Sequence, residues 1–267
     1  MLDFSNSKIL IVGDVMLDKY YFGKVDRISP EAPVPIVNIQ KEESRLGGAS
    51  NVANNIVSLG GHSLLCGVIG HDLFGKEIER ISRHKNIDTF LLKTSSPTIT
   101  KARIIGGKQQ IVRVDYEDKS ELNADNKKLF RDTISRILPE YDILVISDYG
   151  KGLISEDLCR YLIKLAHKYD KKVIIDPKGK NWEKYSGADI VTPNVKELSD
   201  IVGYTVPNTD RAIEKAAREA ITNNHLTALL VTRSDKGMSL IGPIPPIHIP
   251  THSEEVFDVS GAGDTVV

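Results

Sequence analysis

Short apolar runs alternate with helical patterns along this chain, and this alternation restricts the possible folds more than any other feature. The clearest helix is predicted for residues 156–169, where Leu158, Leu162 and Leu165 recur at the spacing of one helical face. Strand, helix and strand in this order predict an α/β fold, a mostly parallel sheet with helices on both faces. The predicted strands are residues 8–12, 64–69, 143–147, 172–175, 190–192 and 228–232; the predicted helices are 49–59, 74–82, 156–169 and 210–223, the last with Asp210 as its cap.

Two stretches interrupt this alternation. Residues 32–39 alternate apolar and polar side chains around two prolines, which is typical of an edge strand. Residues 98–116 hold two β-like runs joined by Gly106 and Gly107, which predicts a hairpin. We expect the two stretches to form a small β lid over one end of the main sheet, within a single domain spanning residues 1–267.

Composition excludes several classes of partner. Lys and Arg total 35 and Asp and Glu 36, so the net charge of −1 provides no basic field for nucleic acid. No apolar run is long enough to cross a membrane, and the start of the chain lacks the pattern of a secretory leader. Cys66 and Cys159 form no metal-binding motif and suit a reducing compartment, so a cytoplasmic location is expected.

The Gly-rich run that ends in Asp264 is the strongest chemical signal. Gly261, Ala262 and Gly263 would open a helix whose backbone N–H groups converge on an anion. Asp264 follows directly and could remove a hydroxyl proton while these amides stabilise a phosphoryl group in transfer. The alternative is a Gly-rich turn in which Asp264 is only a favourable charge at a helix N-terminus. On this run alone the two interpretations are about equal.

A second group of residues suits the hydroxyl groups of a sugar. Asp14 follows the first predicted strand, where open α/β sheets bind ligands. Gly47 and Gly48 precede a predicted helix and permit close backbone approach, and Asn51 offers both a donor and an acceptor. The alternative for Asp14 is an aspartate that only stabilises a turn, and this interpretation is stronger for Asp18. The alternative for Gly47, Gly48 and Asn51 is a helix entry with a buried Asn.

A third group suits a nucleotide. Asn194 and Glu197 lie three residues apart after a predicted strand, so Asn194 could contact a phosphate and Glu197 could hold Mg²⁺ through water. A capping box is the simpler interpretation of this pair. Lys178 follows another strand and could bind a phosphate, although a solvated lysine is the simpler interpretation. Gly237 is suited to a backbone approach to a nucleotide.

The motifs together resemble the ribokinase-like (PfkB) carbohydrate kinases, a resemblance that covers essentially the whole chain. It rests on Gly47-Gly48 with Asn51, on Thr192–Glu197 and on Gly261–Asp264. Further runs are similar to the branch of this family that phosphorylates a heptose 7-phosphate, and they are residues 9–37, 97–105, 144–152, 175–179 and 229–240. The resemblance implies a ribokinase-like three-layer sandwich with a β lid.

The resemblance also implies an activity: ATP- and Mg²⁺-dependent phosphorylation of D-glycero-β-D-manno-heptose 7-phosphate at O1, for lipopolysaccharide core precursors. Asp264 would be the base, Arg103 and Lys178, with Arg113 third, would meet the 7-phosphate, and the lid would form a homodimer. The implied anion hole is Gly261, Ala262 and Gly263; the sugar ligands are Asp14, Gly47, Gly48 and Asn51; the nucleotide site is Asn194, Val195, Lys196, Glu197, Thr232 and Gly237, with Glu197 on the metal through water.

Two alternatives remain open at this point. The first is another sugar kinase of the same family, of the fructokinase or ribokinase type, and the second is a non-catalytic sugar-binding module. The chain ends at Val267, where the Gly-rich turn should open a helix. We therefore expect the C-terminal part of the fold to be missing, which favours the binding module, whereas Asp264 favours an enzyme.

Overall fold

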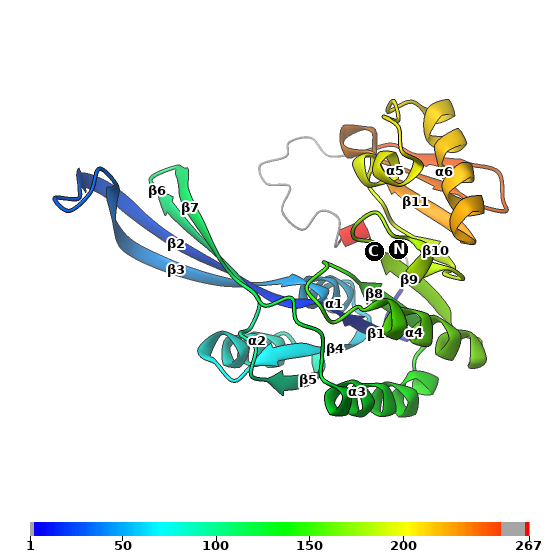
Figure 1. Cartoon of the computed structure of the whole chain (residues 1–267), viewed down its shortest axis with the longest axis horizontal. Helices are drawn as coiled ribbons and strands as arrows, with labels where there is room; N and C mark the ends of the chain where they lie inside the picture. The colour runs from blue at the N-terminus through cyan, green and yellow to red at the C-terminus, as the bar shows by residue number, and fades with distance from the viewer. Residues whose placement is uncertain (1–2, 252–264, 267) are drawn as a thin grey trace.

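The computed structural model describes residues 3–251 and 265–266, and it builds them around one large sheet from which a smaller sheet projects (Figure 1). The strands of the large sheet are β1 (Lys8–Gly13), β4 (His62–Gly70), β5 (Asp88–Thr94), β8 (Ile143–Ser147), β9 (Lys172–Asp176), β10 (Ile190–Val191), β11 (Ala228–Thr232), β12 (Met238–Ile241) and β13 (Ile247–Ile249). Their order is β13-β12-β11-β10-β9-β8-β1-β4-β5. The pairs from β11 to β5 are parallel, and only β12 and β13 add antiparallel strands at one edge.

Helices cover both faces of the large sheet, which confirms the expected three-layer α/β sandwich. The helices are α1 (Ala49–Ser58), α2 (Leu73–His84), α3 (Ala124–Ile137), α4 (Glu156–Lys168), α5 (Val195–Val202) and α6 (Asp210–Asn224), with short 3-10 turns η1 (Leu138–Glu140), η2 (Glu183–Tyr185) and η3 (Ser234–Lys236). Ile11 and Val145 face α1 and α2, whereas Leu10 and Leu144 face α3, α4 and α6. Alternate residues of each central strand therefore fill two separate cores, which explains why these strands are apolar throughout.

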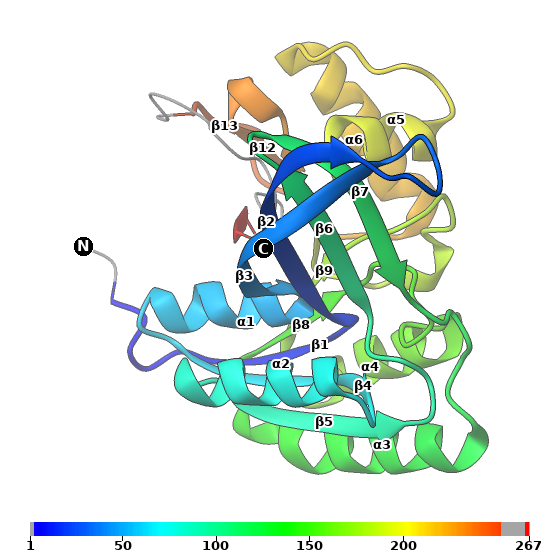
Figure 2. The ribbon, with the colours of Figure 1, turned by 90° about the vertical axis from the view of Figure 1, so that its left-hand side faces the viewer.

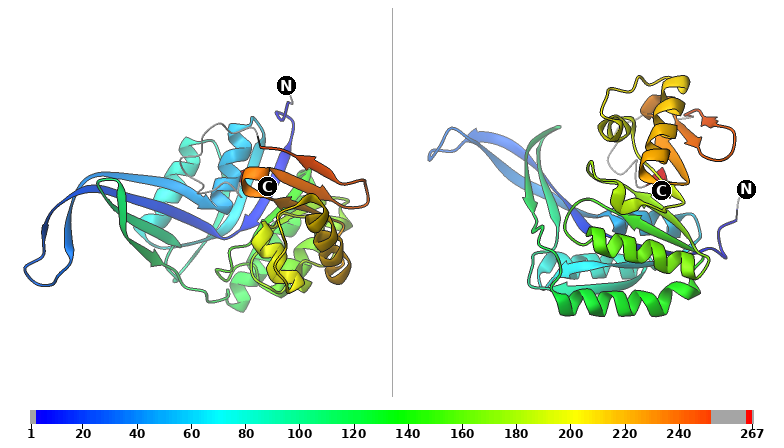
Figure 3. Two further views of the ribbon diagram at one scale, coloured as in Figure 1. Left: turned by 90° about the horizontal axis from the view of Figure 1, so that it is seen from above. Right: turned by 45° about the vertical axis from the view of Figure 1, so that its right-hand side comes forward.

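The smaller sheet contains the two stretches expected to form a lid, and it extends well beyond the body (Figures 1 and 3), while Figure 2 looks along it from its far end. Its strands are β2 (Val15–Ile28), β3 (Pro35–Gly48), β6 (Thr100–Gly106) and β7 (Gln109–Tyr116), in the order β3-β2-β6-β7. The hairpin of β6 and β7 and the edge position of β3 are as predicted. The edge strand is longer than expected, because it begins at Pro35 and continues to Gly48.

Several elements lie outside the sequence predictions, and one predicted cap is wrong. The elements that were not predicted are the strands β2, β5, β12 and β13 and the helix α3. The first half of β2 lacks a regular alternation of apolar and polar residues, which is the pattern that marks a strand. Asp210 does not cap α6: Thr209 occupies the N-cap position without a side-chain bond, and Asp210 instead accepts a hydrogen bond from Arg233 at 2.6 Å. Within residues 3–251 and 265–266, no helix is both long enough and apolar enough to span a bilayer.

Removal of apolar volume from the α4 side of the core should destabilise the fold. Leu162 on α4 is fully buried, so Leu162→Ala should lower the free energy of unfolding by about 2–5 kcal/mol, measured by denaturant titration. Leu73→Ala on α2 is the matched control, because that side chain is 78% exposed and its loss should change stability by less than about 0.5 kcal/mol. Equal effects of the two variants would contradict the described core.

Candidate active site

The polar motifs gather along one edge of the large sheet. Asp14, Asp148 and Lys178 follow the ends of β1, β8 and β9, while Asn194 follows β10 and Thr232 ends β11. These five strands run parallel and adjacent, so their carboxyl ends face the same side. Ligands of open α/β sheets bind at such an edge. The motifs that follow predicted strands therefore share one edge of the sheet.

Asp14 connects three elements at the centre of this edge. Its Oδ2 accepts hydrogen bonds from the backbone N–H groups of Tyr149 at 2.8 Å and Lys151 at 3.1 Å, which fixes the loop after β8. Its carbonyl oxygen accepts from Ala49, the first residue of α1. The residue is only 2% exposed, and Oδ1 has no hydrogen-bond partner among the described residues. Burial raises the pKa of Asp14 to about 6, with the nearby charge of Asp148 adding to the rise.

The two glycines before α1 permit a close approach of the lid to the sheet. Gly48 has a φ of +55°, and a Cβ there would lie 2.6 Å from the Asp14 carbonyl oxygen. A Cβ on Gly47 would lie 2.4 Å from Oδ2 of Asp18. Asn51 lies on the first turn of α1 and is half-buried. The structure thus brings Asp18, rather than the side chain of Asp14, against the glycine pair.

Arg103 lies on β6 of the lid and contacts Asp18. Its guanidinium donates to Oδ1 of Asp18 at 2.5 Å and covers the ring of Tyr20, with 5.1 Å from Cζ to the ring centroid. Arg113 on β7 instead pairs with Asp115 at 2.8 Å. Both expected phosphate-binding arginines are therefore already neutralised by carboxylates in the described structure.

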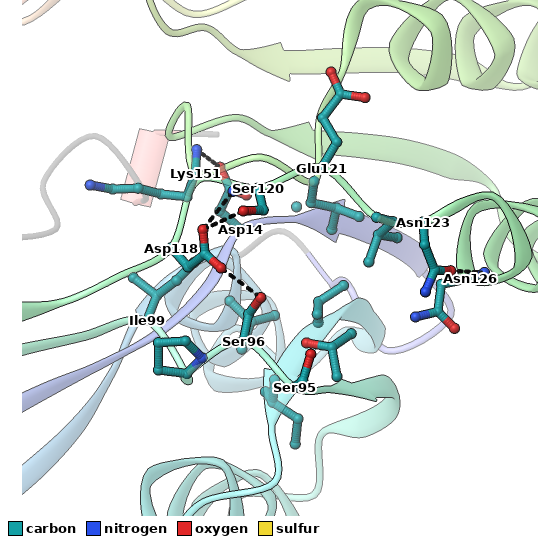
Figure 4. A pocket seen from close by; sticks show the side chains of 18 residues that line it. Asp14, Ser95, Ser96, Ile99, Asp118, Ser120, Glu121, Asn123, Asn126 and Lys151 are labelled. Carbon is teal, nitrogen blue, oxygen red and sulfur yellow. Dashed lines mark hydrogen bonds between the residues drawn. The ribbon is translucent and has the colours of Figure 1, made fainter.

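A cavity of about 340 Å³ lies beside Asp14, at the carboxyl ends of β1, β4 and β5 (Figure 4). Polar side chains of the loop before α3 line it, and Asp118 accepts hydrogen bonds from Ser96 and Ser120 there. Lys151 closes one side of the cavity and pairs with Glu117. The two glycines and Asn51 lie outside its lining, so the expected sugar ligands divide between this cavity and the base of the lid.

A second cavity, of about 620 Å³, gathers the residues predicted for a nucleotide. It lies between the carboxyl ends of β10 and β11 and the antiparallel edge of the sheet. Five of the six residues predicted to bind a nucleotide line it: Asn194, Val195, Lys196, Thr232 and Gly237. Residues that are more than 40 positions apart in the sequence therefore share one concave surface, as a nucleotide site requires.

The sixth residue, Glu197, forms a capping box with Asn194, as the simpler interpretation predicted. Oδ1 of Asn194 accepts from the Glu197 N–H at 2.9 Å, and Oε2 of Glu197 accepts from the Asn194 N–H at 3.1 Å. Nζ of Lys178 lies 3.5 Å from Oε1 of Glu197. Lys178 therefore lies beside the candidate nucleotide residues, whereas Arg103 lies on the lid. The cap leaves lone pairs on the Glu197 carboxylate for metal-bound water, and it leaves the Asn194 amide donors free for a phosphate.

Two buried polar networks that the motifs did not reveal hold the walls of the site. Arg233 is 3% exposed and its guanidinium donates to Asp210, Asn208 and Ser239, which joins β11, β12 and the start of α6. Asp148 accepts from Lys184 and from the Tyr185 hydroxyl, which ties the loop after β8 to η2. Neither network has a local sequence signature, because its members are joined only by tertiary contacts.

The Gly-rich run with Gly261, Ala262, Gly263 and Asp264 lies outside the described residues. The chain is described again at Thr265 and Val266. Thr265 accepts a hydrogen bond from Asn55 of α1 at 3.2 Å, and Val266 lines the 620 Å³ cavity. The described chain on the C-terminal side of the run therefore lies between α1 and the candidate nucleotide cavity.

The fold is similar to that of solved sugar and sugar-phosphate kinases. The tetrameric inhibited form of phosphofructokinase-2 from Escherichia coli matches 97% of this chain with a TM-score of 0.80, at 20% identity and over 84% of its own length. Ribokinase of Arabidopsis thaliana with ribose and ATP matches 97% of the chain with a TM-score of 0.74, at 20% identity and over 83% of its length. At such identities the likeness establishes a ribokinase-like fold.

The sequence comparisons establish the class. The model of the pfkB family of carbohydrate kinases matches residues 6–267, which is nearly the whole chain. The bifunctional protein HldE of Haemophilus influenzae strain PittEE is 46% identical over 99% of the chain, and that of Vibrio vulnificus strain YJ016 is 45% identical over 99%. The chain spans 55% of the length of each of these relatives. It belongs to the pfkB family of carbohydrate kinases.

Asp14→Asn should make the protein more stable at neutral pH. The pKa of Asp14 is raised from 3.8 to about 6 on folding, so the folded state binds more protons than the unfolded state between these values. Wild-type stability is therefore lost as the pH rises through this window, by up to about 3 kcal/mol. In denaturant titrations, the stability of Asp14→Asn relative to wild type should increase from pH 4 to pH 6.5.

The exposed Asp132 on α3 provides the control for this measurement. The difference between Asp132→Asn and wild type should stay flat over the same range. A flat difference for Asp14→Asn as well would contradict the burial cost assigned to its carboxylate.

Proposed function

We propose that this chain transfers the γ-phosphoryl group of ATP to O1 of D-glycero-β-D-manno-heptose 7-phosphate, forming the 1,7-bisphosphate for lipopolysaccharide core precursor synthesis. One observation supports this most strongly: residues of two separately predicted nucleotide motifs, Asn194–Lys196 and Thr232 with Gly237, line one cavity, on the same sheet edge as the glycine pair at the base of the lid. The high identity to bifunctional HldE proteins favours a heptose over other sugars.

The sugar would lie at the base of the lid, over Gly47 and Gly48. Asp18 lies against Gly47 and, with Asn51 on the first turn of α1, offers acceptors and donors to hydroxyl groups. The buried Asp14 adds Oδ1, which needs a donor. The lid then covers the substrate and keeps water from the reacting phosphoryl group.

The nucleotide would occupy the 620 Å³ cavity. Backbone at Gly237 and Thr232 would contact the nucleoside, while the amide of Asn194 would donate to a phosphate. Mg²⁺ would be held by Glu197 through water, and when bound it neutralises charge that develops on the phosphates. The capping box fixes the Glu197 carboxylate for this task.

Asp264 would take the proton from O1 as this oxygen attacks the γ-phosphorus and the bond to ADP breaks. Gly261, Ala262 and Gly263 would donate backbone N–H groups to the transferring phosphoryl group. The contacts of Thr265 with Asn55 and of Val266 with the nucleotide cavity support this assignment, because a base must act between sugar and nucleotide.

The lid would join two copies of the chain. Several apolar side chains of the lid are exposed, and a surface of this kind is characteristic of a protein interface. They are Val25, Ile28, Ile39, Ile111, Val112, Val114 and Tyr116.

Sedimentation of the protein should give a dimer, because the exposed apolar side chains of the lid would be covered by a second copy. A monomer at micromolar concentration would contradict this part of the proposal.

Asp264→Asn should abolish catalysis and leave sugar binding in place, because it removes the base but keeps the side-chain shape. We expect kcat for heptose 7-phosphate to fall by at least about 100-fold in a coupled ADP assay, while calorimetry still detects the sugar phosphate. Asp132→Asn, exposed on α3, should retain wild-type turnover. Unchanged turnover in Asp264→Asn would exclude the proposed role.

The same assay distinguishes the substrate alternatives. Heptose 7-phosphate, fructose and ribose are compared at equal concentrations with the wild-type protein. A preference for fructose or ribose would replace the heptose assignment with another sugar kinase of the family. Sugar binding without binding of an ATP analogue would favour the non-catalytic module.

A further inference from the structure

The face of the lid above the glycine pair carries two rows of charged side chains in register. One row crosses the lid as Arg45, Asp18, Lys101 and Asp115 on β3, β2, β6 and β7. The next row, two residues further along, is Glu43, Tyr20, Arg103 and Arg113. Residues paired in register, or two positions apart on one strand, point to the same side of a sheet. The two rows therefore form one polar face.

Charge on this face is balanced except at one position. Arg103 pairs with Asp18 at 2.5 Å, Arg113 with Asp115 at 2.8 Å, and Arg45 with Glu43 at 2.9 Å. Lys151, which approaches from the loop after β8, pairs with Glu117. Each of these cations has a carboxylate partner. Lys101 has no carboxylate within ion-pair distance among residues 3–251 and 265–266, so it is the excess positive charge.

Lys101 is also partly withdrawn from water. Its side chain is half-buried, and Nζ lies 5.6 Å from the centroid of the Tyr149 ring, a cation–π contact. Burial lowers the pKa of Lys101; the nearby charge of Asp18 opposes this lowering in part, and the cations Lys151 and Arg103 add to it. A half-buried cation without an anion is costly to the fold. It is expected where a ligand supplies the missing charge.

We propose that Lys101 binds the phosphate that the sugar substrate already carries, and that it makes this kinase selective for phosphorylated over free sugars. This inference rests on the proposed function, and it reassigns the phosphate contact from Arg103 and Lys178 to Lys101. Arg103 is neutralised by Asp18, and Lys178 lies against Glu197 on the nucleotide side. Lys101 stands in register with Asp18, which contacts Gly47, so one ligand can reach both groups.

The fixed position of Tyr149 supports this assignment. The backbone N–H of Tyr149 is held by the buried Asp14, and its ring faces the Lys101 ammonium. The Tyr149 ring therefore holds the Lys101 ammonium in place without a carboxylate. The three N–H donors of Lys101 can then point to a ligand. A phosphate dianion offers three acceptor oxygens and negative charge. The arginines of this face already have carboxylate partners, so Lys101 is the cation that the phosphate would pair with.

The test compares Lys101→Met, which removes the charge, with Lys101→Arg, which keeps it. Lys108→Met is the matched control, because Lys108 is exposed in the turn between β6 and β7. KM and kcat are measured for heptose 7-phosphate, for the same heptose without phosphate, and for fructose 6-phosphate, each with ATP. Inorganic phosphate is titrated as a competitor, and thermal unfolding verifies that each variant is folded.

We expect Lys101→Met to raise KM for heptose 7-phosphate by about 10- to 100-fold and to weaken inhibition by inorganic phosphate to a similar extent. KM for ATP and the rate with the phosphate-free heptose should not change. Lys101→Arg should recover most of the affinity, and Lys108→Met should match wild type.

The outcomes separate this inference from the proposed function. If Lys101→Met and Lys108→Met turn over heptose 7-phosphate with equal KM, Lys101 does not bind the phosphate. The proposed heptose kinase function would be unaffected by that result. Lys101-dependent turnover of fructose 6-phosphate instead of heptose 7-phosphate would support the inference and refute the heptose. A wild-type preference for phosphate-free sugars would overturn both.

Discussion

The buried carboxylate of Asp14 is the interaction on which the rest of the site depends. Its side chain fixes the backbone of the loop after β8, and its carbonyl fixes the first residue of α1. That arrangement requires glycine at position 48 and directs the Tyr149 ring toward the lid. The cost is a buried carboxylate whose pKa is raised because burial penalises its charged form. The buried carboxylate lowers the stability of the fold at neutral pH, but its hydrogen bonds fix the backbone where the lid, the sheet and α1 meet.

The site is asymmetric in how its charges are arranged. On the lid side, three arginine–carboxylate pairs surround Lys101, which has no carboxylate within ion-pair distance in the described part of the chain. On the nucleotide side, Lys178 and Glu197 neutralise each other beside a capping box that opens α5. The two halves are therefore suited to different anions: a sugar phosphate that meets a single free ammonium, and a nucleotide that meets backbone and amide donors. This division follows from which carboxylates the folded chain brings next to which cations.

Much of the scaffold could be predicted from the sequence, because the central strands are apolar runs between helices of clear periodicity. Ile143–Ser147 and Ala228–Thr232 have the predicted bounds. That Asn194 and Thr232 share one cavity was predictable, because Asn194 lies in the loop after β10 and Thr232 ends β11, and the strand order brings these positions together. Strand β2, the Arg233 network and the pairing of Arg103 with Asp18 were not predictable, since the first half of β2 lacks a regular alternation and tertiary partners determine the other two. The roles of Asp264 and its glycines stay predictions.

We propose that one sheet edge holds a phosphorylated sugar against the lid and a nucleotide in the cavity near β11. A crystal structure of the protein with heptose 7-phosphate and a non-hydrolysable ATP analogue would locate both ligands. We expect the sugar over Gly47 and Gly48, its phosphate within hydrogen-bond distance of Lys101 Nζ, and the nucleoside between Asn194 and Gly237. A sugar phosphate bound at Lys178, or a nucleotide outside that cavity, would contradict it.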